Sequence, residues 1–343
     1  MPKSADHPFQ LLTSRFYCFN DGDDATAEWF PQGVSTVADA QADQQWGSKQ
    51  AILVSWYSKG GKGVRVSFLD PATGDYQHVL LVYPYTNSNG NPSYEAVTTP
   101  QAGDGGSVHA GGIVWYGNYL YVADTRRGLR VFDMRRIFDI KSAGSGDVED
   151  SSRVGRHDNK YYSYGYRYVM PQVFGYSHPG GLATHPADHV CNAGGPQKFS
   201  SVALDRSTTP DTLITSEYCA TVSAERNGRV ARYPMDGGSG LPAMTGGVWQ
   251  ATAAHRMPKA NTQGAVAHEA RWFLSRTGRG EQGAGYLTTA TASGSTGDLV
   301  ETGDRNAAIG VEDLSYWPGS EEIFTVTEYP DKRVVYGVTP PSP

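Results

Sequence analysis

The sequence is poor in charged residues and in long apolar runs, and each shortage excludes a class of protein. Only 19% of the 343 residues are charged, and 35 acidic residues outnumber 29 basic ones, which gives a net charge of −6. Because no block of Lys and Arg occurs, we expect no nucleic-acid or anionic-membrane partner. No run of about 18 apolar residues is present, so a membrane-spanning helix is not expected either.

Cysteine is also scarce. The three cysteines, Cys18, Cys191 and Cys219, allow one disulfide and one free thiol without showing which pair forms. No C-x-x-C motif is present, so a finger-type zinc site is not expected. The first six residues are polar and lack an apolar segment, whereas Tyr, Gly, Ser and Thr are abundant and Lys is rare. This composition favours a secreted protein whose signal peptide has been removed over a cytoplasmic protein. We also expect a monomer.

Short runs of alternating residues fill the chain, while amphipathic helical patterns are nearly absent. Residues 52–57, 64–70 and 79–84 are rich in β-branched and aromatic side chains, and the turn-forming segments 59–63 and 70–74 separate them. This pattern is typical of an antiparallel meander and predicts an all-β protein.

The meander repeats five times in the same register. The first strands of the units are expected to start near residues 32, 111, 200, 263 and 312. The second strands are expected at 52–57, 119–124, 212–218, 272–276 and 322–329, and the third at 64–70, 129–134, 229–235, 286–290 and 332–338. Fourth strands are expected at 79–84, 166–171 and 248–258. Repeated antiparallel units predict a single β-propeller domain over residues 1–343.

The last unit ends after its third strand, and residues 10–19 form the strand that is predicted to complete it. Such pairing closes the ring and leaves no open edge. We therefore expect five blades, or six if the interval 138–200 hides another. A β-sandwich or a pair of jelly rolls is disfavoured because neither predicts the same register five times.

In a propeller the first strands line the central channel, and antiparallel order brings their starts to the face where the second strands end. One mouth of the channel then gathers carboxylates, arginines, histidines and aromatic rings, which together suit a polar ligand and especially a sugar. The predicted catalytic residues are Glu312, Asp313, His109, Glu217, Asp124 and Glu328. The predicted substrate-binding residues are Gln32, Gln263, Trp56, Tyr57, Arg126, Arg276, Tyr218 and Tyr329.

A structural role is the alternative for several of these residues. Glu217 and Glu328 can bond backbone amides at blade corners, and Asp124 can belong to a salt-bridged hairpin turn. Gly111 and Gly112 can serve only close strand packing near the axis. Glu312 and Asp313 are adjacent carboxylates at a channel-lining start, a placement that is costly unless they are paired, metal-bound or used in chemistry.

Metal binding is a separate hypothesis. His178, His185 and His189 have the spacing of metal ligands but fall in a Gly/Pro-rich loop, which makes them weak candidates. Calcium held by channel carboxylates is the metal that we expect more, because negative charge gathers there.

The five repeated units resemble the five-bladed β-propellers found among carbohydrate-active enzymes and lectins. The resemblance is one of architecture over nearly the whole chain, and it assigns no role to any single residue. From the residues gathered at the mouth we expect a secreted enzyme, either a glycoside hydrolase or a polysaccharide lyase, with a glycan or other polar small molecule as substrate. A non-enzymatic carbohydrate- or protein-binding propeller is the first alternative, and a metal-dependent propeller enzyme is the second.

Overall fold

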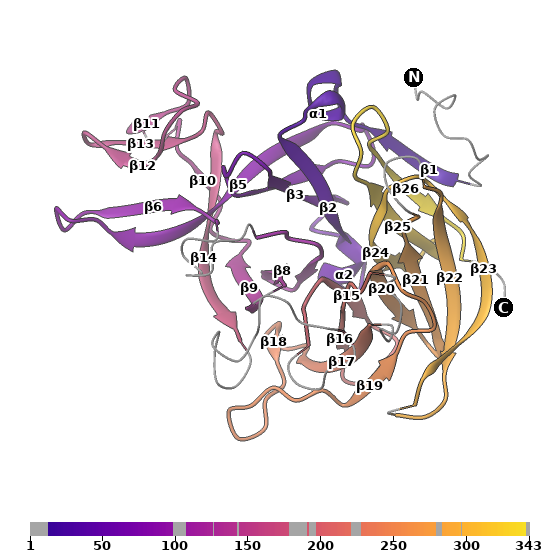
Figure 1. The fold of residues 1–343 in the computed structure, drawn as a ribbon. Helices are drawn as coiled ribbons and strands as arrows, with labels where there is room; N and C mark the ends of the chain where they lie inside the picture. The colour runs from indigo at the N-terminus through magenta and orange to yellow at the C-terminus, as the bar shows by residue number, and fades with distance from the viewer. Residues whose placement is uncertain are drawn as a thin grey trace.

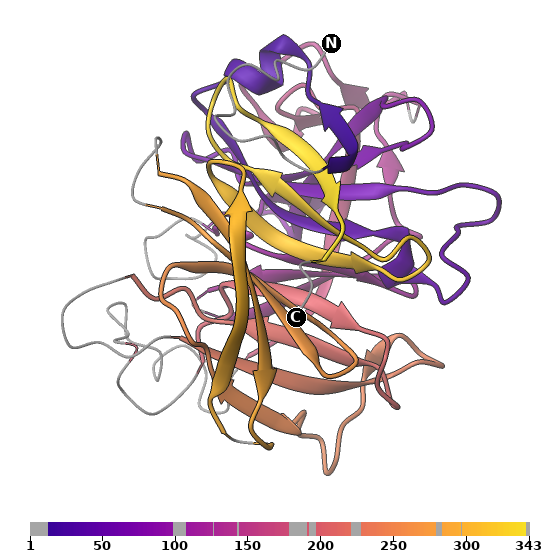
Figure 2. The ribbon, with the colours of Figure 1, turned by 90° about the vertical axis from the view of Figure 1, so that its right-hand side faces the viewer.

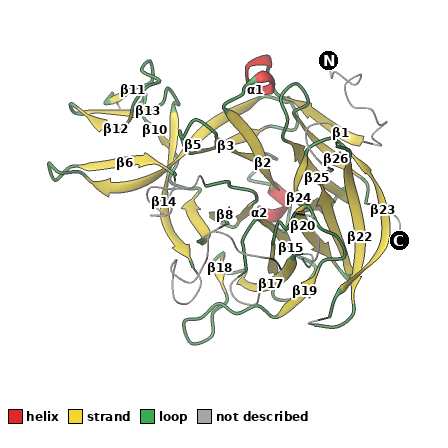
Figure 3. Ribbon diagram, viewed as in Figure 1, coloured by secondary structure: helices red, strands yellow, loops and turns green. Residues whose placement is uncertain are grey.

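The computed structural model describes residues 13–98, 108–125, 127–142, 144–177, 191, 197–220, 228–278, 283–295 and 297–340. Within these ranges the chain is almost entirely β-structure, with two short helices, α1 (Asp21–Ala25) and α2 (Val37–Ala40) (Figure 3). The described residues include no helix with the length and apolar character needed to cross a membrane.

Five antiparallel four-stranded blades surround a common axis, near which α2 lies (Figure 1). Blade 1 holds β2 (Trp29–Thr36), β3 (Ile52–Ser58), β4 (Val64–Leu69) and β5 (Tyr76–Thr86); blade 2 holds β7 (Ile113–Tyr116), β8 (Tyr119–Asp124), β9 (Gly128–Asp133) and β14 (Tyr168–Tyr176). Blade 3 holds β15 (Ser201–Asp205), β16 (Thr212–Ser216), β17 (Arg229–Asp236) and β19 (Ala253–Arg256). Blade 4 holds β20 (Thr262–His268), β21 (Arg271–Arg276), β22 (Gly285–Ala292) and β23 (Leu299–Ala307).

Blade 5 consists of β24 (Val311–Trp317), β25 (Glu322–Thr327), β26 (Val334–Val338) and the N-terminal strand β1 (Thr13–Cys18). β1 pairs antiparallel with β26, with Phe16 opposite Tyr336. Figure 2 shows this indigo strand beside the yellow strands of the C-terminal part. The predicted all-β propeller of five blades, closed by an N-terminal strand, is confirmed.

The interval 138–200 does not hold a sixth blade in its described part. It contains β10 (Phe138–Asp139) and a small sheet outside the ring, formed by β11 (Gly146–Asp147), β12 (Val154–His157) and β13 (Lys160–Ser163). Strand β14 then does two things: Tyr168–Pro171 pairs in parallel with β5 of blade 1, and Gln172–Tyr176 completes blade 2. The fourth strand of blade 2 is predicted at 166–171, whereas the segment that pairs with β9 begins at Gln172. β6 (Pro92–Ala96) and β18 (Leu241–Pro242) add short pairings at the edges of blades 1 and 3.

Close packing at the axis explains the glycines at the strand starts. A Cβ on Gly112 would lie 2.3 Å from the backbone nitrogen of Val202, and one on Gly264 would lie 2.7 Å from Cα of Asp313. Only glycine lets the first strands of successive blades approach so closely. This packing fixes where each first strand begins, and hence which side chains reach the channel mouth.

Candidate functional site

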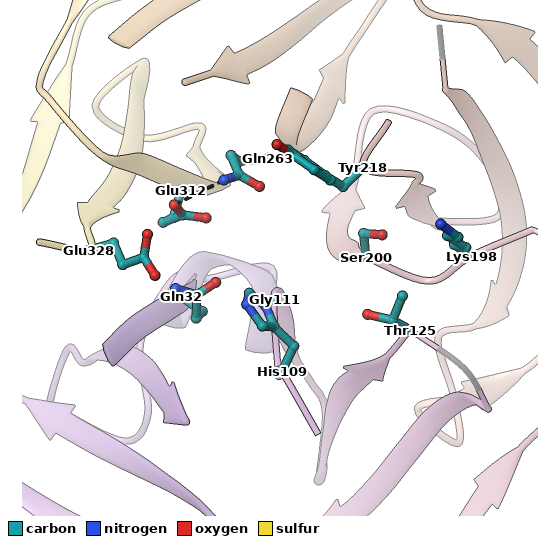
Figure 4. A pocket seen from close by; sticks show the side chains of 10 residues that line it. All are labelled: Gln32, His109, Gly111, Thr125, Lys198, Ser200, Tyr218, Gln263, Glu312 and Glu328. Carbon is teal, nitrogen blue, oxygen red and sulfur yellow. Dashed lines mark hydrogen bonds between the residues drawn. The ribbon is translucent and has the colours of Figure 1, made fainter. Parts of the chain in front are cut away.

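A cavity of about 370 Å³, lined mainly by residues with polar side chains, lies at the channel mouth, where first strands begin and second strands end. All five blades reach it, and its lining differs from blade to blade. The lining residues are Gln32, His109, Gly111, Thr125, Lys198, Ser200, Tyr218, Gln263, Glu312 and Glu328 (Figure 4). The structure therefore brings six of the predicted site residues together: Gln32, His109, Tyr218, Gln263, Glu312 and Glu328.

Glu312 is the most enclosed acid of this cavity. It lies near the start of β24 with 1% of its surface exposed, and Oγ of Ser275 donates a hydrogen bond to its backbone carbonyl at 2.5 Å. Its side-chain Oε1 accepts a hydrogen bond from Nε2 of Gln263 at 3.2 Å. Burial, with added repulsion from Glu328 and Asp313, raises the pKa of Glu312 well above its usual value. The cavity wall thus favours the neutral, protonated form of this carboxyl group over the ionised form.

Glu328 supplies the second carboxyl group in the cavity wall. It follows β25, and its backbone N–H donates to the carbonyl of Gly310 at 2.9 Å. Glu328 raises the pKa of Glu312, and both glutamates add to the raised pKa of Tyr218, whose main cause is desolvation of its hydroxyl group. Two glutamates and an exposed tyrosine ring thus face one space (Figure 4).

Asp313 turns away from the cavity although it follows Glu312 in sequence. Its Oδ2 accepts hydrogen bonds from the backbone N–H groups of Val34 at 3.3 Å and Ile113 at 3.2 Å, and its Oδ1 has no hydrogen-bond partner among the described residues. Burial raises the pKa of this carboxyl well above its usual value. The structure therefore places this predicted catalytic residue among the packed inner strands.

His109 enters the cavity from a constrained turn. The next residue, Ala110, has φ of 51°, a region that non-glycine residues rarely occupy, and Oγ of Ser55 donates to its carbonyl at 2.8 Å. One face of the imidazole stacks on Tyr57 with ring centroids 4.6 Å apart, and the rest of the residue is exposed where it lines the cavity. Its enclosed surroundings, and then the nearby Lys59 ammonium, lower its pKa to about 4, so the ring is neutral at pH 7.

Two other predicted catalytic acids are committed to ion pairs outside the cavity lining. Oδ2 of Asp124 accepts a hydrogen bond from Nε of Arg130 at 2.9 Å and lies 2.9 Å from Nη2 of the same guanidinium in a salt bridge. Glu217 is fully buried and accepts hydrogen bonds from Nε of Arg229 at 2.9 Å and Nη2 at 2.7 Å. These two residues match the structural alternative that the sequence left open.

Four predicted binding residues also lie outside the lining. Arg276 donates to Thr288 at 2.7 Å and to Asp304 at 2.6 Å, on blade 4. Trp56 is fully buried, and Tyr57 packs behind His109 instead of lining the cavity itself. Tyr329 packs beside Gly310, where an added Cβ would lie 2.7 Å from its ring.

Arg126, His178, His185 and His189 lie outside the described residues, so their predicted roles stay predictions. In the part of the chain that the structure does describe, no three His, Cys, Asp or Glu side chains form a group able to hold a metal ion. The predicted calcium ion therefore has no assigned ligands.

Lys198 is a lining residue that the sequence analysis missed. It precedes Ser200 by two residues, as His109 precedes Gly111, so the same register would have identified it. The structure also resolves the cysteine pairing: Cys191 and Cys219 form the disulfide, next to Tyr218, and Cys18 is free and exposed.

No family model matches the sequence, and neither does any curated protein. Solved structures give distant likenesses. Hydrazine synthase from Kuenenia stuttgartiensis is 12% identical with a TM-score of 0.35, over 90% of this chain and 76% of the other. A putative 6-phosphogluconolactonase from Bacteroides uniformis is 9% identical with a TM-score of 0.36, over 85% and 77%. At these scores the likenesses imply no function, and the propeller is defined by the chain's own strand order.

Proposed function

We propose that this protein is a secreted glycoside hydrolase whose active site is the cavity at the channel mouth. The observation that carries the proposal is the buried Glu312, whose pKa is raised above its usual value, beside a second carboxyl group, Glu328, in one cavity. Glycoside hydrolysis uses two carboxyl groups in different protonation states, one as proton donor and one as carboxylate.

In the proposed reaction Glu312 donates its proton to the glycosidic oxygen as the bond to the anomeric carbon breaks. Glu328, as carboxylate, stabilises the positive charge that develops at this carbon, either by attacking it or by activating water. Gln32, Gln263 and Ser200 are placed to bond sugar hydroxyls, and the exposed ring of Tyr218 offers a stacking surface for a sugar face.

A polysaccharide lyase is the second candidate, and the neutral imidazole of His109 favours it. In that reaction His109 removes the proton next to the uronate carboxyl group, and elimination releases the sugar oxygen at the neighbouring carbon. A lyase also needs a cation to neutralise the uronate; Arg276, one of the predicted substrate-binding residues, is bonded to Asp304 and Thr288, which disfavours it for that role.

The binding-only and metal-dependent alternatives receive less support. A multivalent lectin repeats its site in each blade, whereas here every blade contributes different side chains to one cavity. The disulfide between Cys191 and Cys219 supports an oxidising, extracellular environment. Calcium remains a proposal without assigned ligands.

The test compares Glu312→Gln and His109→Ala with the wild type on a panel of neutral and acidic polysaccharides. A hydrolase produces reducing ends without an unsaturated, ultraviolet-absorbing product, and Glu312→Gln lowers kcat by about 10²–10⁴-fold. A lyase produces the absorbing product, and His109→Ala is then the inactive variant. Glu301→Gln, on the outer strand β23, is the matched control. Full activity in both cavity variants at unchanged thermal stability contradicts both assignments.

A further inference from the structure

A second cavity, here called the outer cavity, lies away from the channel mouth. Its volume is about 460 Å³, and its described lining residues do not overlap with those of the channel-mouth cavity. Its walls come from the β5–β6 hairpin, from β10 and Ile140, from β14, and from the small sheet of β11, β12 and β13. Figure 1 shows the hairpin and the small sheet projecting from the ring on the same side. The proposed hydrolysis makes no use of this cavity.

Most of the wall of the outer cavity is apolar and rigid. Phe138 lines it although 53% of its surface is exposed. Tyr94 and Tyr161 also line it, and their rings stack with centroids 5.9 Å apart and planes 15° apart. Three further rings of the lining belong to Pro84, Pro92 and Pro171. Flat, rigid surfaces of this kind suit a planar apolar ligand.

Contacts between the small sheet and the hairpin fix the shape of the outer cavity. Oγ of Ser93 accepts a hydrogen bond from the backbone N–H of Arg156 at 2.9 Å. Gly155, with φ of 83°, lies so close to the hairpin that an added Cβ would be 2.3 Å from the backbone oxygen of Tyr94. The cavity is therefore formed in the protein alone, without a ligand to shape it.

The hydroxyl group of Tyr94 is the feature that points to a ligand. Only 9% of Tyr94 is exposed, and its hydroxyl oxygen is buried without a hydrogen-bond partner among the described residues. The neighbouring hydroxyl of Tyr161, in contrast, donates to the carbonyl of Pro92 at 3.2 Å. A buried hydroxyl without a partner is costly, and such groups are usually satisfied by protein or by an ordered molecule. The Tyr94 hydroxyl therefore marks a place for one polar group of a ligand.

The charges around the outer cavity favour a neutral ligand. Among the described lining residues, Asp139 alone is acidic or basic, and its Oδ2 accepts hydrogen bonds from Nε of Arg167 at 3.0 Å and from Oγ of Ser142 at 2.6 Å. Burial raises the pKa of Tyr94 above its usual value, so its hydroxyl stays neutral and can donate or accept a hydrogen bond. A charged ligand would lose its hydration here without gaining an opposite charge.

We propose that the outer cavity binds a small, neutral aromatic molecule that carries one hydroxyl or carbonyl group. The aromatic ring lies against the apolar wall, and the polar group forms a hydrogen bond with the hydroxyl of Tyr94. The volume of the cavity falls within the range of about 300–1,000 Å³ that is usual for small-molecule sites. A sugar is disfavoured because most of its hydroxyl groups would meet apolar side chains. This inference is independent of the proposed hydrolase.

Four bicyclic probes test the proposal by titration in saturation-transfer NMR: 2-naphthol, naphthalene, decahydro-2-naphthol and 2-naphthoate. We expect the wild type to bind 2-naphthol about three- to tenfold more tightly than naphthalene, because one neutral hydrogen bond contributes a factor of this size. Decahydro-2-naphthol keeps the hydroxyl but lacks the aromatic ring, and 2-naphthoate is charged. Both should therefore bind more weakly than 2-naphthol.

Three variants locate the binding. Tyr94→Phe keeps the ring and removes the hydroxyl, so it should bind 2-naphthol and naphthalene equally, with no loss of affinity for naphthalene and no fall in melting temperature. Phe138→Ala, at an exposed position, removes part of the wall and should weaken both aromatic probes about fivefold. Tyr85→Phe is the matched control, because Tyr85 is 44% exposed on β5 and is not among the lining residues, and it should behave as the wild type.

Several results would overturn the proposal. The wild type would bind none of the probes, or would bind decahydro-2-naphthol or 2-naphthoate as tightly as 2-naphthol. Tyr94→Phe would keep the preference for 2-naphthol, or Phe138→Ala would bind the aromatic probes with unchanged affinity, which would place their binding elsewhere. A lower melting temperature of Tyr94→Phe without ligand would show that the hydroxyl already has a partner in the folded protein.

Discussion

Gln263 donates a hydrogen bond from Nε2 to Oε1 of Glu312 at 3.2 Å, so a side chain of blade 4 holds the buried acid of blade 5. Gln32 occupies the same Gln-Gly position in blade 1, yet its amide donates to the carbonyl of Pro31 at 2.9 Å. The same Gln-Gly dipeptide thus contacts a side-chain carboxyl group in one blade and a backbone carbonyl in the other. In the proposed reaction the other oxygen of Glu312 is the one that carries the acidic proton.

Gln263→Leu tests the importance of this bond to the proposed reaction. The amide donor of Gln263 stabilises the ionised form of Glu312, and the substitution removes this donor. The pKa of Glu312 should therefore rise further, and the alkaline limb of the pH–kcat profile should move to higher pH. Loss of orientation should lower kcat by about tenfold. Gln77→Leu, at an exposed position of β5, should change neither quantity. An unchanged pH profile in Gln263→Leu would contradict the role given to Glu312.

We expect Asp313 to contribute to the stability of the fold and not to the reaction, in contrast to Glu312. Asp313→Asn keeps an oxygen for the N–H groups of Val34 and Ile113, so activity and stability at pH 7 should stay close to wild type. Asp313→Ala leaves both donors buried without partners, at a cost of about 1–3 kcal/mol each. Urea denaturation and kcat measure the two effects. A large loss of kcat in a stable Asp313→Asn variant would show that this residue takes part in the chemistry.

The sequence predicts the inner part of each blade better than the outer part. Inner strands such as β3 are buried on both faces, so their sequences are nearly continuous runs of apolar residues. The outer strand β23, with the sequence Leu-Val-Glu-Thr-Gly-Asp-Arg-Asn-Ala, is half exposed along its length and carries almost no apolar pattern. The divided pairing of β14 depends on which strands become its neighbours, which no local pattern contains.

The same limit applies to the candidate site. Strand register brings His109, Gln263 and Glu312 to the mouth, because it depends only on where each first strand begins. It cannot separate cavity acids from paired acids, since Glu217 is neutralised by Arg229 from the neighbouring strand. Tertiary partners decide which carboxylates remain for chemistry.

Asp39 should make the folded state less stable as the pH rises from 4 to 6. It is an almost fully buried residue of α2, and burial raises its pKa to about 6, despite hydrogen bonds from Ser35 and Ser315. Below pH 3.8 Asp39 is protonated in both the folded and the unfolded state. Between pH 3.8 and about 6 it ionises only in the unfolded state, which lowers the free energy of that state. The stability contributed by the neutral form is therefore lost as the pH approaches 6, by about 3 kcal/mol.

Urea denaturation of wild type and Asp39→Asn between pH 4 and pH 7 measures this contribution. The free energy of unfolding of the wild type should fall relative to the variant as the pH rises, because Asn cannot ionise. Asp43→Asn, at an exposed position, should run parallel to the wild type. A constant difference between wild type and Asp39→Asn across this range would show that Asp39 has the same pKa in both states.

Arg333 links ring closure to the candidate site. Nη1 donates to the carbonyls of Asp23 at 2.7 Å, Asp24 at 3.1 Å and Thr26 at 2.9 Å, in the segment that joins the closing strand β1 to blade 1. Nε donates to the carbonyl of Glu328 at 2.8 Å. One guanidinium group of blade 5 therefore holds both the N-terminal segment and the residue that carries the second carboxyl group of the cavity.

Arg333→Met keeps the apolar stem and removes these donors. Because several carbonyls lose their partner at a buried position, we expect the free energy of unfolding to fall by about 3–5 kcal/mol. Arg333→Lys, which retains the charge but not the planar fork, should fall between wild type and Arg333→Met. Arg136→Met, at a side chain that is 62% exposed, should change stability by no more than about 0.5 kcal/mol. Because Glu328 loses its anchor, kcat should also fall at temperatures where Arg333→Met remains folded. Equal stability of Arg333→Met and Arg136→Met would mean that the ring closes without this contact.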